Sequence, residues 1–378
     1  MGSDKNKQQE TSPIDFNNEV FILGAGFSKA LNPNYPTLKE LSKAIEEQYS
    51  RLATDEHKLF DQPTTMIAKY YFLLPKEIRN NIEHVLTYLY ADFPWKTHVE
   101  QNMDKALYFD ILHRISYLFS YQPSNIKPEY KKLGEYINQK NATCITFNYD
   151  LLLEKLLNDT FTFRAALTDK KIVSDSYKHH YRMPLTTFDA KDYLKTDSYD
   201  YPEILKLHGS INWIYKTNGN INDLMFNPTA NNYGIPEGYS PFIVPPVIDK
   251  TLFYKNPHLP QIWQIAKERI KWANNIYIIG YSFPETDLSA KFLIEFAMQK
   301  NPIEDYDDKK IYLVDLKPNK NLNEFCRNKG VNLQEINCSK CEHYRARAKA
   351  LGKICETCTT MPMDNFIQNV IAPKVISL

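Results

Sequence analysis

Five short apolar runs in this 378-residue chain each end at a glycine or a polar residue, and segments with helical periodicity separate them. Alternation of strand and helix patterns is typical of a parallel sheet with helices on both faces. Ligands of such sheets bind at the carboxyl ends of the strands. Any single polar residue could simply terminate its strand, but that explanation fits the whole set poorly. We therefore predict a Rossmann-like α/β fold in which one crevice is lined by the residues that follow the five runs, namely Gly24, Asn148, His208, Gly280 and Asp315.

Periodicity divides the chain into expected elements. Strands are predicted at residues 20–23, 143–147, 204–207, 276–279, 311–314 and 331–336, and helices at 262–272, 288–298, 322–327 and 366–371. Between about residues 51 and 140 the pattern is helical almost throughout, which predicts a large α-helical insertion. The stretch from about 160 to 201 lacks a clean period and predicts a small accessory lobe. The Gly-, Asn- and Pro-rich stretch 218–246 predicts loops that cover the site.

Composition excludes several classes of protein. A hydrophobic content of 43% is enough to bury one large core with insertions or two smaller ones. The net charge of +1 supplies no global field toward nucleic acid or an anionic membrane. No apolar run is long enough to cross a bilayer, and the polar first residues lack the hydrophobic stretch of a secretion signal. We expect a cytoplasmic protein with no membrane association.

Four of the six cysteines form two Cys-x-x-Cys pairs, Cys338 with Cys341 and Cys355 with Cys358. Two short loops that each present two thiolates suit tetrahedral zinc, and four sulfur ligands leave no open position for a substrate. A redox pair and a chance pattern are the alternatives. We predict a structural zinc module with a terminal helix at 337–378, after a flexible arm at 1–18 and a Rossmann-like domain at 19–336. The other two cysteines, Cys144 and Cys326, are expected to be buried apolar residues.

The first predicted strand runs into the turn Gly24-Ala25-Gly26-Phe27-Ser28. Glycines after a strand let the backbone turn sharply and approach a pyrophosphate, whose charge is favoured by free N–H groups and by the start of the next helix. Lys29 occupies the place of the third glycine in the dinucleotide fingerprint, which counts against an ordinary dehydrogenase. The kind of nucleotide site therefore has to be identified from two further motifs, Phe147-Asn148-Tyr149-Asp150 and Leu207-His208-Gly209-Ser210.

Together these motifs make the chain resemble the sirtuin superfamily from about Glu19 to Ile336, and most closely the sirtuin-like NAD-hydrolysing domains of bacterial antiphage defence systems. The glycine turn resembles the Gly-Ala-Gly-x-Ser loop of sirtuins. Residues 146–150 resemble their Thr-Gln-Asn-Ile-Asp motif, and His208 with Gly209 resembles their catalytic His-Gly segment. The segments that resemble the defence branch are 81–85, 243–246 and 280–287.

This resemblance implies an NAD glycohydrolase that releases nicotinamide and leaves ADP-ribose. Breaking that bond places positive charge on the sugar carbon, so the site needs geometry and charge compensation. Asn148 would orient a water or a ribose hydroxyl, and His208 would be the base. Asp150 would hold the nicotinamide carboxamide, and Asp315 would accept hydrogen bonds from the adenosine ribose, which favours NAD over NADP. The other expected contacts with NAD are Gly24, Ala25, Gly26, Phe27, Ser28, Thr37, Gly280, Tyr281 and Ser282.

Each assignment has a structural alternative. Asn148 could cap the helix that begins near Asp150, and His208 could be an ordinary strand-end histidine bonded to backbone. The aromatic side chains of Trp213, Tyr281 and Phe283 are expected to pack rather than to stack on a base. Protein deacylation is disfavoured, because deacylating sirtuins carry their zinc ribbon in mid-chain. Here the cysteines follow the last predicted strand and need not build an acyl-lysine groove.

The resemblance also implies an effector of antiviral defence that depletes NAD and is controlled by homo-oligomer assembly or by a partner. Such effectors work with HerA-type ATPases, Argonaute-like proteins or signal-binding domains. A separate HerA-type ATPase is the leading expectation, because the chain has room for no ATPase of its own. The basic segment between the cysteine pairs is expected to form a protein interface or a solvent-exposed surface, and contact with nucleic acid is not favoured. The rival functions are a non-catalytic NAD sensor and a zinc-dependent nucleic-acid adaptor.

Overall fold

The computed structural model describes most of the chain between Glu19 and Lys374. The described residues are 19–54, 62–120, 125–161, 180–181, 186–187, 201–227, 234–245, 256–284, 287–298, 310–314 and 363–374. Predictions that concern the first 18 residues, the helix at 322–327, the strand at 331–336 or the four paired cysteines lie outside these ranges.

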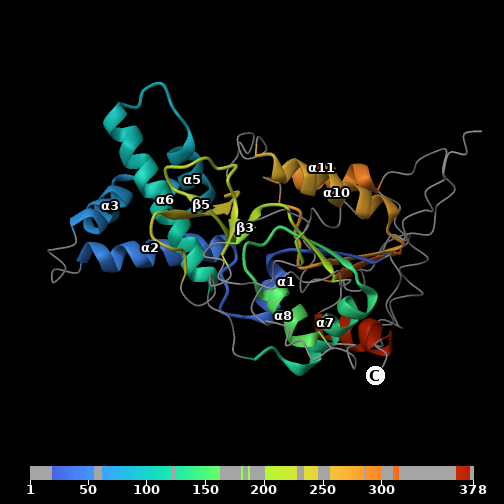
Figure 1. Ribbon diagram of the computed structural model, residues 1–378. Coiled ribbons are helices and arrows are strands. Elements are labelled where there is room, and N and C mark those ends of the chain that lie inside the picture. The colour runs from blue at the N-terminus through green and yellow to red at the C-terminus, as the bar shows by residue number, and fades with distance from the viewer. Residues whose placement is uncertain are drawn as a thin grey trace, which may run out of the picture.

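A five-stranded parallel sheet forms the centre of the molecule (Figure 1). Its order is β4-β2-β1-β8-β9, from β1 (Glu19–Leu23), β2 (Thr143–Thr146), β4 (Glu203–Lys206), β8 (Asn275–Ile279) and β9 (Lys310–Val314). The strands are buried along almost their whole length, which is why β1, β8 and β9 read as nearly continuous apolar runs rather than as an alternating pattern. These bounds confirm the five predicted strands that lie within the described residues.

The strand order contains the switch point that positions ligands in doubly wound folds. From the central β1 the chain moves outward to β2 and β4, and it then returns to the other side of β1 to form β8 and β9. The carboxyl ends of β1 and β8 therefore carry connections that leave in opposite directions, and such a point opens a crevice at the sheet edge.

Helices cover both faces of this sheet, as the Rossmann-like prediction requires. Figure 1 shows α10 (His258–Trp272) and α11 (Leu288–Ala297) on one side, and α1 (Ala25–Leu31), α7 (Pro128–Lys140) and α8 (Leu152–Thr160) on the other. The last described segment consists of α14 (Met363–Phe366), a π-helical stretch at Ile367–Ile371 and a 3₁₀ turn at Ala372–Lys374, and it packs on α7. The helix predicted at 366–371 is thus helical backbone of the π type.

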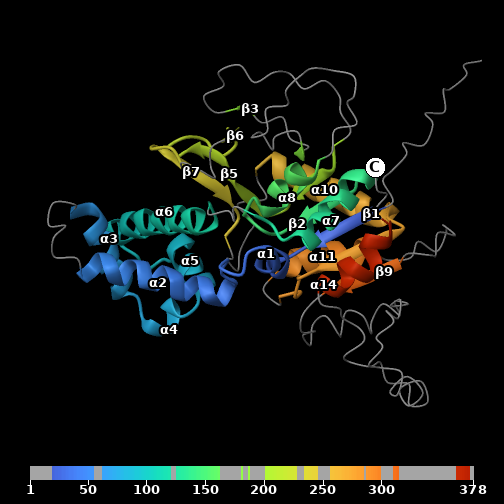
Figure 2. The ribbon, with the colours of Figure 1, turned by 90° about the horizontal axis from the view of Figure 1, so that it is seen from below.

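A separate group of helices extends from one end of the sheet (Figure 2). It comprises α2 (Leu38–Thr54), α3 (Gln62–Leu73), α4 (Lys76–Arg79), α5 (Ile82–Tyr90) and α6 (His98–Ser120). Aromatic packing joins these helices, with the rings of Tyr49 on α2 and Tyr71 on α3 stacked at a centroid distance of 4.4 Å. We call α2–α6 the helical lobe.

A second, four-stranded sheet lies beside the helical lobe and has the order β3-β6-β5-β7. Its strands are β3 (Thr186–Thr187), β5 (Gly209–Lys216), β6 (Met225–Phe226) and β7 (Tyr239–Ile243). The expectation of loops throughout 218–246 was wrong for β6 and β7. Both strands pair antiparallel with β5, which comes earlier in the chain, so pairing with a distant segment overrides local residues that are typical of turns.

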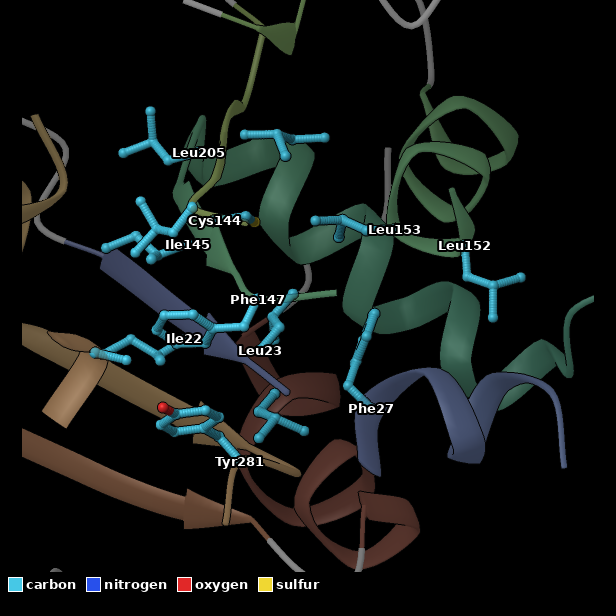
Figure 3. Close-up of a cluster of buried hydrophobic side chains, with 14 of the residues drawn as sticks. Ile22, Leu23, Phe27, Cys144, Ile145, Phe147, Leu152, Leu153, Leu205 and Tyr281 are labelled. Atoms are coloured by element: carbon cyan, nitrogen blue, oxygen red, sulfur yellow. The ribbon is translucent and has the colours of Figure 1, made fainter. Parts of the chain in front are cut away.

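The core is continuous around the carboxyl ends of β1 and β2. Figure 3 shows its buried side chains there, including Leu23, Phe27, Cys144 and Phe147. Cys144 is fully buried and free, as predicted, and burial raises the pKa of its thiol. None of the helices in the described part of the chain combines the length and the apolar character that a bilayer crossing needs.

Candidate functional site

Three glycines interlock the turn after β1 with the turn after β8. The Gly24 N–H donates to Ile279 O at 3.0 Å and the Gly26 N–H donates to Gly280 O at 2.9 Å. A Cβ atom on Gly24 would lie 2.6 Å from Tyr281 Cα, and one on Gly280 would lie 2.6 Å from Gly26 Cα. Gly280 also adopts φ +60°, where only glycine is free of strain. These glycines therefore hold two backbones in contact at the switch point of the sheet.

Asn148 is bonded directly onto the glycine turn. Its Nδ2 donates to Gly24 O at 2.8 Å and to Ser28 Oγ at 2.9 Å. Ser28 in turn donates its hydroxyl proton to Asp150 Oδ2 at 2.6 Å. We call Asn148, Ser28 and Asp150 the bonded cluster, because their side chains form one directional chain of hydrogen bonds.

The helix-capping alternative for Asn148 is not what the structure has. Asp150 Oδ1 accepts from the N–H of Leu152, the first residue of α8, at 3.0 Å. The Asn148 N–H instead donates to the Thr146 side-chain oxygen Oγ1 at 3.1 Å, and the Asn148 side chain points to the glycine turn. Capping is thus a function of Asp150, and Asn148 remains partly exposed.

The electrostatic setting of Asp150 is that of a buried carboxylate with several compensating partners. Burial is the largest influence and raises its pKa, whereas Lys206, the Ser28 hydroxyl and the Leu152 N–H lower it. The carboxylate oxygens accept from Ser28 and from Leu152. These bonds orient Ser28, so that its oxygen faces the amide of Asn148.

His208 lies at the end of the neighbouring strand, after β4. Its Nε2 is 3.4 Å from Asp287 Oδ2, and both side chains are more than nine-tenths buried. The Phe147 ring lies on one side with its centroid 5.3 Å from that of the imidazole, and the Trp263 ring lies 6.3 Å away. The backbone oxygen of His208 accepts from Val244 N at 2.7 Å, whereas its imidazole faces the Asp287 carboxylate.

Phe147 connects the bonded cluster with the His208–Asp287 pair. It directly precedes Asn148, and its ring stacks on Tyr281 at a centroid distance of 4.5 Å (Figure 3). The strand ends are also tied, because Leu207 N donates to Thr146 O at 3.0 Å. Asn148 and His208 therefore sit at neighbouring strand ends on the same rim as the glycine turn.

The remaining predicted contacts fall into three groups. Ala25, Gly26 and Ser282 are exposed at this rim. Phe27 and Tyr281 are buried in the core, as are Trp213 and Phe283, which confirms that these aromatic side chains pack. Asp315 and the paired cysteines, Cys338, Cys341, Cys355 and Cys358, lie outside the described residues. Within the described residues, no group of three or more His, Cys, Asp or Glu side chains could hold a metal ion.

Thr37 is hydrogen-bonded to a residue in the first turn of the helix that follows it. Its N–H and its hydroxyl both donate to Glu40 Oε2, at 2.8 and 2.9 Å. Lys29 donates to the same carboxylate, and together these bonds lower the pKa of Glu40 to about 2, with the Lys29 bond as the largest cause. Thr37 thus directly precedes α2 and is bonded to its first turn, with no bond to the cluster.

Sequence reasoning assigned no role to Asp287 or to Lys206. Asp287 was visible only as the last residue of the segment 280–287. Lys206 stood out as a lone charge inside the apolar run 204–207, and a charged residue in a fully buried strand is a signal of a polar partner. Neither partner could be named without the fold.

Comparison with known proteins gives a weak likeness in fold. No protein-family model matches the chain, and no curated protein matches its sequence. One solved structure that matches is a crystal structure of a Sir2 homologue in complex with NAD, at 13% identity and a TM-score of 0.34, over 79% of this chain and 77% of that one. Another concerns the mechanism and regulation of Sir2 enzymes, at 12% identity and a TM-score of 0.37, over 81% and 83% of the two chains. At such low TM-scores, a function has to rest on the residues of the site.

Proposed function

We propose that the protein is an NAD glycohydrolase that cleaves NAD into nicotinamide and ADP-ribose. The observation that carries the proposal is the attachment of the Asn148 side chain to the glycine turn through Gly24 O and Ser28 Oγ. A dinucleotide at this switch point would run its pyrophosphate along the glycines. Asn148 would then stand beside the ribose that carries the nicotinamide.

The hydrogen bonds of Asn148 favour a water-orienting function. A carboxamide has two N–H donors, and both contacts of its Nδ2 are made with the protein. Its Oδ1 is the atom that can accept from a water or a ribose hydroxyl. Held at a set angle, that oxygen would place the nucleophile near the sugar carbon, and positioning of this kind lowers the barrier because the entropy of orientation is lost on binding.

The His208–Asp287 pair supports a general base at the same rim. An imidazole can take a proton from water or from a ribose hydroxyl, and the Asp287 carboxylate, 3.4 Å away, would balance the new charge. The imidazole lies near the rings of Phe147 and Trp263, which limit its orientations. Asp287 is accordingly assigned the function of orienting His208.

We further propose that this activity serves bacterial antiphage defence by NAD depletion. Control by homo-oligomer assembly or by a separate HerA-type ATPase, a cytoplasmic location and a structural zinc at the four cysteines belong to the same proposal, and they come from sequence resemblance and cysteine spacing. Protein deacylation and a non-catalytic NAD sensor are the alternatives that the following experiment separates.

The test is release of nicotinamide from NAD, followed by chromatography, with the full chain alone and with the products of neighbouring genes. The wild-type protein should form nicotinamide and ADP-ribose without any acylated peptide, and the same chromatogram separates linear from cyclic ADP-ribose. Asn148→Ala should abolish release and keep its Tm within a few degrees, since it loses two neutral bonds of about 1 kcal/mol each. The matched control is Asn274→Ala, an exposed asparagine at the opposite end of β8. Turnover retained in N148A contradicts the proposal, and a rise in Tm with NAD but no release identifies a sensor.

A further inference from the structure

A buried ion pair lies directly beneath the bonded cluster. Lys206 Nζ on β4 is 2.9 Å from Glu154 Oε1 on α8, and their side chains are 1% and 0% exposed. Lys206 Nζ also donates to the backbone oxygen of Asp150. An ammonium group removed from water is strongly unfavourable unless it is paired and hydrogen-bonded, so these two acceptors define where the lysine can reside.

This lysine joins the two strand ends that carry the candidate catalytic groups. It faces Thr146 in the register of β2 and β4, and it precedes His208 by two residues. Its acceptor, the oxygen of Asp150, follows Asn148 by two residues. One side chain therefore fixes the loop after β2 relative to the end of β4.

The pair is also held from the second sheet. Tyr181 OH donates to Glu154 Oε1 at 2.7 Å, and Asn212 Nδ2 on β5 donates to Tyr181 OH at 3.0 Å. The Glu154 carboxylate is thus bonded by groups on two segments, and Asn212 on a third segment holds one of them. A network of this kind specifies one geometry, because each member is placed by the next.

We propose that Lys206 is a positioning residue, which through Asp150 and Glu154 holds the loop 147–151 where Asn148 meets the glycine turn. The inference deepens the proposed function, and its activity arm rests on that function. Stability alone is a poor explanation of the pair, since replacing a buried ion pair by apolar residues of similar volume is often neutral or stabilising. Geometry at the site is the property that an apolar replacement cannot supply.

The charges around Asp150 give this proposal a signature in pH. The groups that act on its carboxylate are Lys206 from β4, Ser28 from α1, and Glu154 and the Leu152 N–H from α8. Lys206 lowers the pKa of Asp150 and ranks above Glu154, which raises it. Removing both charges should therefore raise that pKa, whereas removing only Glu154 should lower it.

The experiment compares Lys206→Met/Glu154→Met with Glu154→Gln and with a control pair. Methionine is unbranched and fills the space of either side chain. The control is Lys96→Met/Asp104→Leu, which removes a second buried ion pair, of 2.7 Å with both side chains 2% exposed, in the loop before α6 and on α6 of the helical lobe. Each variant is assayed for nicotinamide release, for the pKa of the Asp150 carboxyl by NMR, for Tm, and for amide hydrogen exchange over residues 147–152.

The K206M/E154M variant should stay folded, lose about tenfold or more in kcat with a smaller change in KM, and exchange faster at 147–152. The pKa of the Asp150 carboxyl, followed by NMR, should move up in this variant and down in E154Q. The control pair should leave that pKa and the exchange of 147–152 unchanged. Wild-type kcat, Asp150 pKa and exchange in K206M/E154M overturn the inference. Should that variant not fold, an unmoved Asp150 pKa together with wild-type exchange of 147–152 in E154Q overturns it.

Failure of the proposed function gives a different result from failure of this inference. If the wild-type protein releases no nicotinamide, the glycohydrolase function is contradicted. The exchange of 147–152 then decides the inference on its own, because it reports the loop without any turnover.

Discussion

Replacing Ser28 by alanine tests the bonded cluster most sharply, because one hydroxyl serves both Asn148 and Asp150. The hydroxyl donates to Asp150 Oδ2 at 2.6 Å and accepts from Asn148 Nδ2 at 2.9 Å. Ser28 is 4% exposed, so water cannot readily replace either bond. A bond to a charged group contributes about 1.5–3 kcal/mol and a neutral one about 1 kcal/mol. We expect Ser28→Ala to lower the free energy of unfolding by about 3 kcal/mol at neutral pH.

The loss of stability should depend on pH with a defined sign. Burial raises the pKa of Asp150 above its ordinary value of 3.8, and the Ser28 bond opposes that rise. A carboxyl whose folded pKa lies above its unfolded value makes the folded state less stable as the pH rises between the two values. S28A raises the folded pKa further, so its extra loss of stability is present at neutral pH. That loss should shrink as the pH falls through the raised pKa toward 3.8.

Urea unfolding, followed by the fluorescence of the four tryptophans, measures this difference at neutral pH and at about pH 4. The matched control is Ser116→Ala, a serine of α6 in the helical lobe that is 2% exposed. S28A should also slow nicotinamide release by about tenfold or more, because Asn148 loses one of two anchors. The reasoning is refuted if S28A is no less stable than S116A at neutral pH. It is also refuted if S28A loses the same free energy of unfolding, relative to wild type, at both pH values.

Three further predictions concern the rim and the cysteines. Asp287→Asn should lower kcat by roughly 10²-fold in the nicotinamide assay, since His208 loses its charged partner, and Asp287→Glu should restore part of it; equal rates in D287N and wild type would exclude the pair from the reaction. Gly280→Ala should lower Tm far more than Gly238→Ala, because both sites have positive φ but only the first Cβ would meet another backbone, and similar Tm values would contradict the interlocked turns. Metal analysis should find one zinc per chain, reduced in Cys355→Ser, and no zinc in the wild type would remove the predicted module.

The fold was readable from the sequence wherever burial leaves a one-dimensional trace. A parallel strand covered on both faces is apolar at most of its positions, so runs such as Val20–Leu23 and Ile276–Ile279 identify their strands without help from the rest of the chain. The second sheet left no such trace. Strand β7 contains Pro241 and follows Gly238, and only its antiparallel partner β5 makes that segment extended.

The residues of the site likewise divide into those that the sequence identifies and those that it does not. Gly24, Asn148 and His208 could be selected from the sequence because each follows an apolar run, and the carboxyl ends of parallel strands share one edge. Their partners could not be selected. Asp287 stands 79 positions after His208 and Lys206 stands 52 after Glu154, and no periodicity relates residues across such distances.

By itself, the sequence determined the existence of the parallel strands and which residues stand at their ends, because both depend on local burial and on chain direction. Only the tertiary structure decided the strand order, the attachment of Asn148 to the glycine turn, and the carboxylate beside His208. Hydrogen bonds and ion pairs join atoms within about 3.5 Å in space regardless of their separation along the chain, so their partners are settled when the sheet assembles.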